Sequence, residues 1–151
     1  MISVLVYLDD GDQTHWRYAL DNFEADRVYV AGGVQTPRLR NYTEGTPSQD
    51  LPVILLSPEG SEWEVPTHDL RTFNHPEDAL YVFYPNFCPP STKVVPDQVV
   101  FIPTDNHPHG MYNYTAYSIT MWHRRSQQYS HGTGNTNNGY TEEQRRTDGN
   151  E

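Results

Sequence analysis

Five short apolar runs punctuate the chain, and each has the length of a β-strand. They cover residues 2–8, 27–31, 51–56, 79–84 and 99–102, and each is followed by the Asp, Gly, Ser or Pro residues that end strands. Two of the runs show little alternation of apolar and polar positions. That pattern is typical of strands buried on both faces of a parallel sheet.

A helix is predicted after the first run. Apolar positions recur there at spacings of four and three, which places on one helical face Trp16, Leu20 and Phe23. Asp10 and Gln13 stand three residues apart, as in a capping box, and Asp12 is an alternative N-cap. A shorter helix is predicted over residues 67–73.

A last helix is predicted to begin near Met111 and to fray at Arg124 and Arg125. Its apolar stripe consists of Tyr112, Ala116, Ile119 and Trp122. After it the composition changes, and Ser, Gln, Asn, Gly, Thr and charged residues dominate. We therefore expect one domain over residues 1–125 and a flexible polar tail over residues 126–151.

The order of these elements predicts the fold class. Strands that alternate with helices indicate an α/β domain, here with a mostly parallel five-stranded sheet and helices on both faces. Parallel sheets of this kind bind ligands outside the carboxyl ends of their strands. A site is therefore expected in the loops that follow the apolar runs.

Composition narrows the classes of function. The chain has 20 acidic residues against 10 Lys and Arg, a net charge of −10, which excludes a simple polybasic nucleic-acid binder. RNA binding would need a local cluster of cations, such as Arg17, Arg38, Arg40 and Arg71. The single cysteine, Cys88, excludes an internal disulfide and a cysteine-rich zinc site.

The distribution of apolar residues suggests a location. No apolar run approaches the ~20 residues of a membrane span, and the first residues lack the basic segment of a signal peptide. We therefore expect a cytoplasmic protein that makes no contact with membranes.

Three segments near the expected ligand edge carry a recognisable pattern. They are Phe83-Tyr84-Pro85-Asn86 after the fourth run, Ile102-Pro103-Thr104 after the fifth, and Met111-Tyr112-Asn113 at the start of the last helix. In this order they resemble the end of SpoU-type (SPOUT) RNA methyltransferases. In that family one strand ends Phe-Gly-x-Glu, another ends Ile-Pro-Met/Thr, and a helix begins Ser-Leu-Asn. Residues 17–30 are similar to the family's Arg-Thr-Ala-x-x-Phe-Gly-x-x-x-Val segment.

The resemblance extends from about residue 2 to residue 124 and implies a function. It implies a C-terminal trefoil knot that binds S-adenosylmethionine, a homodimer with the site at its interface, and methyl transfer to a ribose 2′-hydroxyl. The substrate would be RNA (tRNA or rRNA) and not DNA. Arg17 takes the position of the catalytic arginine, and Asn113 would order the loop or the ribose. The cofactor-binding residues implied are Phe83, Tyr84, Pro85, Asn86, Ile102, Pro103, Thr104, Met111 and Tyr112.

Several positions depart from the family pattern. Gly11 stands where the family has Asn, Tyr84 where it has the glycine of Phe-Gly-x-Glu, and Asn86 where it has Glu. A glycine lets a ligand approach the backbone closely, whereas tyrosine adds a Cβ and a ring. The alternative hypothesis is therefore a catalytically inactive knotted protein that acts as a protein- or RNA-interaction module, with Tyr84 filling the cofactor pocket.

The same residues also have plainer interpretations. Arg17 fits a solvated helix arginine paired with Asp21, and Asn113 fits a helix N-terminus, where Asn is favoured. His107 and His109 lack further ligands at a suitable spacing, so a polar loop is favoured and no metal site is predicted; His75 and His123 would join them only through the fold. The aromatic stripe of the last helix is more typical of a core or dimer interface than of a base-stacking platform.

Overall fold

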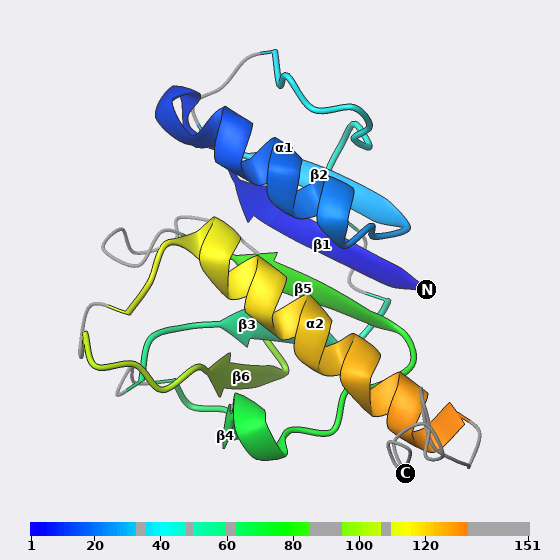
Figure 1. The fold of residues 1–151 in the computed structure, drawn as a ribbon, viewed down its shortest axis with the longest axis vertical. Helices are drawn as coiled ribbons and strands as arrows, with labels where there is room; N and C mark the ends of the chain where they lie inside the picture. Colours follow the sequence, from blue (N-terminus) through cyan, green and yellow to red (C-terminus); the bar gives the residue numbers. More distant parts are fainter. Residues whose placement is uncertain (33–35, 48–49, 60–62, 85–94, 107–109, 133–151) are drawn as a thin grey trace, which may run out of the picture.

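All six strands of the sheet run parallel. The fold is defined by a computed structural model, which describes residues 1–32, 36–47, 50–59, 63–84, 95–106 and 110–132, with side chains to residue 128. The strands follow the order β2-β1-β5-β3-β6-β4 (Figure 1). Their bounds are Ile2–Tyr7 (β1), Arg27–Ala31 (β2), Val53–Leu56 (β3), Thr67–Asp69 (β4), Ala79–Phe83 (β5) and Gln98–Phe101 (β6). The α/β class and the parallel sheet are confirmed, and the predicted count of five strands is wrong.

The extra strand, β4, lies where a short helix was predicted over residues 67–73. This polar segment pairs in parallel with β6, from Thr67 opposite Val99 to Asp69 opposite Phe101. Asp69 then accepts a hydrogen bond from the backbone amide of Arg71 (2.9 Å), which starts a 3₁₀ turn, η2, over Leu70–Thr72. The helix prediction failed because partners distant in the sequence satisfy this backbone.

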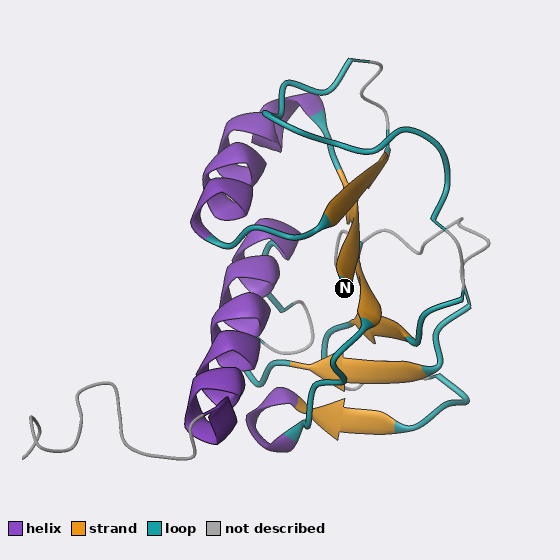
Figure 2. Ribbon diagram, turned by 90° about the vertical axis from the view of Figure 1, so that its right-hand side faces the viewer, coloured by secondary structure: helices purple, strands orange, loops and turns teal. Residues whose placement is uncertain are grey.

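Both α-helices in the part of the chain that the structure describes lie on the same face of the sheet. Figure 2 shows α1 (Gln13–Asn22) and α2 (Asn113–Gly132) side by side on that face, while loops cross the other. The predicted placement of helices on both faces is therefore wrong. None of these helices is long and apolar enough to cross a membrane.

The sheet is nevertheless buried on both faces. One core cluster joins alternate strand residues such as Val4, Val6 and Tyr81 to Trp16 of α1 and Tyr117 of α2. A second cluster lies on the face without α-helices, and it consists of Leu5, Tyr29, Val53, Leu55, Leu80, Val82, Tyr84 and Val99. Burial of successive residues on opposite faces explains the continuous apolar runs of β3 and β5.

Asp12, the predicted alternative, is the N-cap residue of α1, and the capping box lies one residue earlier than predicted, at the start of a 3₁₀ turn. The backbone amide of Asp9 donates to Oδ1 of Asp12 (2.9 Å), and a 3₁₀ turn, η1, over Asp10–Asp12 precedes the helix. Gln13 Nε2 donates to Asp10 Oδ1 (3.2 Å) in addition. The predicted apolar face is confirmed, since the side chains of Trp16 and Leu20 are buried.

The last helix begins two residues later and ends later than predicted. It starts at Asn113 and continues past Arg124 and Arg125 to Gly132. Its extension packs on the domain: Gln127 Nε2 donates to the carbonyl of Phe73 (2.5 Å). Residues 133–151 of the predicted tail lie outside the described residues, as do residues 85–94 and 107–109 on which the predicted knot depends. The tail and the knot stay predictions.

Candidate cofactor site at the strand ends

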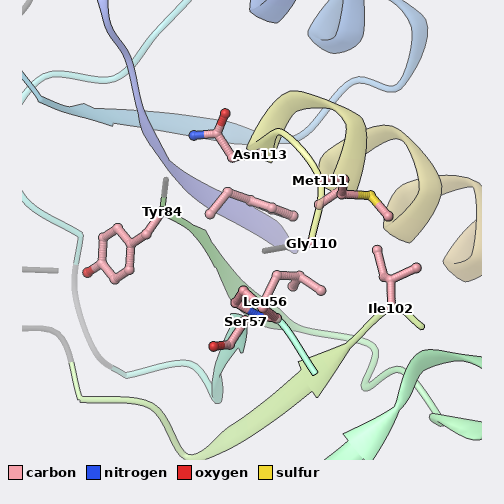
Figure 3. Close-up of a pocket in the computed structure, with 10 residues that line it drawn as sticks. Leu56, Ser57, Tyr84, Ile102, Gly110, Met111 and Asn113 are labelled. Carbon is pink, nitrogen blue, oxygen red and sulfur yellow. The ribbon is translucent and has the colours of Figure 1, made fainter. Parts of the chain in front are cut away.

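A pocket lies where the carboxyl ends of β3 and β5 and the residue after β6 meet the start of α2 (Figure 3). It is lined by Leu56, Ser57, Pro58, Phe83, Tyr84, Ile102, Gly110, Met111, Asn113 and Ala116. This is the edge of a parallel sheet at which ligands bind. The neighbouring strands β1 and β5 also connect onward in opposite directions across the sheet, which places the pocket next to a topological switch point.

The fold brings much of the predicted site together. Predicted site residues that line the pocket are Phe83, Tyr84, Ile102, Met111 and Asn113. Three other predicted site residues do not line the pocket. Pro103 and Thr104 follow the lining residue Ile102, and Tyr112 stands between Met111 and Asn113. Two more, Pro85 and Asn86, lie outside the described residues. The motifs missed Leu56, Ser57 and Pro58. A signal for them existed, since they are the end of a predicted strand.

Asn113 ties the start of α2 to the end of β1. Its side chain is buried, and its Nδ2 donates to the backbone carbonyl of Tyr7 (3.1 Å). The carbonyl of Tyr112 accepts the first helical hydrogen bond from the amide of Ala116 (3.0 Å). Asn113 therefore fixes how the pocket wall formed by α2 meets the sheet.

The ring of Tyr84 does not fill the pocket. It belongs to the core cluster on the face without α-helices and packs edge-on against Tyr7, with ring centroids 4.8 Å apart. Figure 3 shows the ring pointing away from Met111 and Ile102. Burial, with a smaller contribution from Tyr7, raises the pKa of the Tyr84 phenol, so the hydroxyl stays protonated. Tyr84 thus belongs to the lining of the pocket, while its ring lies on the opposite face of the sheet.

The segment after β6 is closed by hydrogen bonds across the turn. Asn106 Nδ2 donates to the carbonyl of Gly110 (2.9 Å), and the amide of Gly110 donates to the carbonyl of Asn106 (2.8 Å). Thr104 Oγ1 accepts from the amide of Asn106 (3.1 Å). Gly110 has φ of +77°, a conformation that favours glycine. These contacts fix both ends of the segment that borders the pocket.

Comparison with protein-family models and with curated protein sequences finds no match. Among solved structures, TrmJ from Z. mobilis ZM4, a SPOUT tRNA methyltransferase, superimposes with a TM-score of 0.62. The likeness covers 82% of this chain and 67% of that chain, at 13% sequence identity. The chain has the fold of TrmJ. At 13% identity the likeness is one of fold, and the α/β fold is the one that the predicted resemblance implies.

The resemblance to the SPOUT family implies S-adenosylmethionine as cofactor. The residues that line the pocket suit this molecule in their chemistry, whereas the volume of the pocket is small. Strand-end backbone, the side chains of Ser57 and Asn113, and apolar walls are groups that hold a nucleoside and a thioether. The enclosed volume is about 20 Å³, room for one water molecule. Cofactor pockets have ~300–1,000 Å³. Binding would therefore require the half-buried side chains of the wall, such as Met111, to move outward.

Arg17 lies elsewhere. It is exposed on α1 and borders a second pocket with Asp21, Arg40 and Asn41. Asp21 pairs with Arg40 (3.0 Å), so the ion pair between Arg17 and Asp21 that the plainer interpretation assumed is replaced by another. The second pocket gathers Arg17 and Arg40 from the predicted cationic patch. Arg71 lies apart, paired with Asp69 at the β4 edge (2.6 Å).

His75 and His123, the two more distant metal candidates, do meet. His75 Nε2 lies 2.9 Å from His123 Nδ1, and His75 Nδ1 lies 2.7 Å from the hydroxyl of Tyr81. Across the described residues no group of three or more His, Cys, Asp or Glu side chains is placed to hold a metal ion. The pair lies near the amino end of β5, away from the strand-end pocket, and takes no part in the candidate site.

Proposed function

We propose that the protein is an S-adenosylmethionine-dependent RNA 2′-O-methyltransferase of the SPOUT class, and a divergent member of it. The observation that carries this proposal is convergence. The three segments that resemble the family's motifs lie far apart in the sequence, yet residues of all three line one pocket at the strand ends of a TrmJ-like fold.

The chain's own residues would hold the cofactor in the following way. The backbone at Phe83 and Tyr84 and at Ile102–Thr104 would contact the nucleoside, and Met111 would form an apolar wall. Bound S-adenosylmethionine would supply a methyl group on a sulfonium. Tyr84 in place of glycine is compatible with this arrangement because its ring packs on the opposite face of the sheet.

Arg17 would act from a second copy of the chain. Within one chain it borders a different pocket from that of the cofactor residues, so an arginine at the ribose requires a homodimer. The planar guanidinium suits bidentate contact with a target phosphate and would favour ionisation of the nearby 2′-hydroxyl. Asn113 would hold the pocket wall in register through its contact with Tyr7.

Calorimetric titration with S-adenosylmethionine tests the cofactor. Ala116→Leu places a larger side chain in the pocket and should abolish binding, whereas the matched variant Ala116→Ser should retain it. Absence of heat for the wild-type chain at high micromolar cofactor would reject the proposal.

Mixed dimers test the role of Arg17. Arg17→Ala has an intact pocket without the arginine, and Ala116→Leu keeps the arginine but has a blocked pocket. Each variant alone should fail to transfer a radiolabelled methyl group to RNA. An equal mixture should recover about a quarter of wild-type activity, because half of the dimers are mixed and each has one complete site. No recovery would exclude action in trans.

The small pocket volume favours the second hypothesis, an inactive knotted interaction module. Under that hypothesis the wild-type chain binds no cofactor, and Tyr84→Gly does not restore binding, because the Tyr84 ring packs on the opposite face of the sheet. The same titration therefore separates the two functions.

A further inference from the structure

Three aromatic rings form a stack beside the candidate site. The imidazole of His15 lies parallel to the ring of Tyr114, with centroids 4.7 Å apart and planes 14° apart. Tyr114 in turn stacks with Tyr112, at 5.3 Å and 9°. The rings come from α1 and from the start of α2, so the packing of the two helices creates the stack.

This parallel arrangement differs from that of the buried rings next to it. Trp16 meets Phe83 at 69° and Tyr117 at 61°, the edge-on geometry usual in protein cores. Trp16 also holds Tyr114 edge-on, at 6.5 Å and 78°. The fully buried ring of Trp16 therefore supports one side of the stack.

The stack ends at an open surface. Tyr112 has 68% of its surface exposed although one face of its ring is covered by Tyr114, so the other face is open to solvent. Tyr112 also stands between Met111 and Asn113, which both line the strand-end pocket. A planar group placed on Tyr112 would continue the column beside the segment whose neighbouring residues line that pocket.

We propose that the outer face of Tyr112 binds an unpaired RNA base by stacking and so presents its nucleotide to the pocket. The inference rests on the proposed function and specifies its substrate as single-stranded RNA or a nucleotide turned out of a helix. Base stacking on an aromatic ring tolerates any base and requires no positive charge at the platform, which suits a chain with a net charge of −10.

Fluorescence anisotropy with a short fluorescein-labelled oligoadenylate tests the platform. Tyr112→Ala should weaken binding about fivefold to a hundredfold, the usual loss for removal of one stacking ring. Tyr112→Phe keeps the ring and should stay within about twofold of wild type. Tyr18→Ala removes an equally exposed tyrosine from α1 (61% exposed) and should also leave affinity within about twofold.

Three results would overturn the inference. They are equal affinities for Tyr112→Ala and wild type, equal losses in Tyr112→Ala and Tyr18→Ala, and tight binding of an abasic oligonucleotide of the same length. A loss in S-adenosylmethionine affinity with unchanged RNA affinity would likewise assign Tyr112 to the cofactor. Cofactor titration on the same variants separates this inference from the proposed function. If the chain binds S-adenosylmethionine but Tyr112→Ala does not change RNA affinity, the stacking platform alone is rejected. If RNA stacks on Tyr112 but the chain binds no cofactor, the methyltransferase alone is rejected.

Discussion

Gly32 brings the chain close to the backbone of Leu8 at the carboxyl end of β2. It follows β2 with φ of +110°, and a Cβ added there would lie 2.6 Å from the carbonyl oxygen of Leu8. We expect Gly32→Ala to lower the free energy of unfolding by about 2–4 kcal/mol, because strain and a backbone clash combine. Gly45→Ala is the control: φ is +98° there and no atom lies within 4 Å, so a loss of about 1 kcal/mol is expected. Urea denaturation measures both, and equal losses would show that the contact with Leu8 is unimportant.

Asn113 should contribute to stability and to the shape of the site together. Asn113→Ala leaves the part-buried carbonyl of Tyr7 without this donor and should cost about 1–3 kcal/mol in urea denaturation. Asn74 is exposed, and Asn74→Ala should cost less than about 0.5 kcal/mol. If Asn113 positions the pocket wall, Asn113→Ala also weakens cofactor binding while the protein is still folded. An unchanged cofactor affinity would limit Asn113 to stability.

Tyr84 shows which part of the site the sequence leaves open. Both Phe83 and Tyr84, the first two residues of the motif, line the pocket. Successive strand residues point to opposite faces, so one of the two side chains had to leave the helix side. Which one leaves depends on the face that α1 and α2 cover, and the continuous apolar run of β5 gives no sign of that. The structure assigns Phe83 to the helix-covered core and Tyr84 to the other.

At the scale of elements, prediction succeeded where burial dominates the sequence. Each of the five apolar runs became a strand, because a parallel strand covered on both faces needs apolar side chains throughout. It failed for β4, whose three polar residues pair through their backbone with β6. It also placed the end of α2 too early. Polar residues after Arg125 suggest a tail, but Gln127 exchanges hydrogen bonds with the backbone of Phe73 and His75.

The second half of α2 is predicted to act as a clamp on the segment before β5. Arg124 is buried and its Nη2 donates to the carbonyls of Pro76 (3.1 Å) and Glu77 (2.7 Å). Arg124→Met should therefore lower the free energy of unfolding by about 2–3 kcal/mol. The matched change Arg125→Met removes an exposed arginine that lies over the Phe23 ring and should cost under about 1 kcal/mol.

Truncation tests the same clamp at the domain boundary. A chain that ends at Arg125 lacks the two hydrogen bonds of Gln127, and it should be about 1–3 kcal/mol less stable than a chain that ends at Gly132. Thermal or urea unfolding of the two chains gives the comparison. Equal stability would restore the boundary predicted at residue 125.

At the scale of the whole molecule, a polar cluster of His75, Tyr81 and His123 near the amino end of β5 links the sheet to α2 and makes the free energy of unfolding depend on pH. Burial, then the neighbouring His123 and Arg124, lowers the pKa of His75 from its ordinary value of 6.5 to about 3. Burial raises the pKa of Tyr81 to about 12, so its phenol keeps a proton that it can donate to His75 Nδ1. His75 is then left to donate from Nε2 to His123 Nδ1. A second proton on His75 would remove the acceptor that Tyr81 uses.

The direction of the pH effect follows from these values. Between pH 6.5 and about pH 3 the unfolded chain binds a proton at His75 and the folded chain does not. The free energy of unfolding therefore has its full value above pH 6.5 and declines as the pH falls below it. Allowing for the partial exposure of the ring, we expect a loss of about 1–2 kcal/mol between pH 7 and pH 5. Urea denaturation at the two pH values measures the loss in the wild-type chain and in His75→Gln, which keeps a polar side chain that does not titrate. Between these two pH values the free energy of unfolding of His75→Gln should fall by about 1–2 kcal/mol less than that of the wild-type chain. The cluster lies near the amino end of β5, whereas the cofactor pocket lies at its carboxyl end. The free energy of unfolding should therefore change with pH without a matching change in cofactor affinity. A parallel loss of both would show that the two ends are coupled.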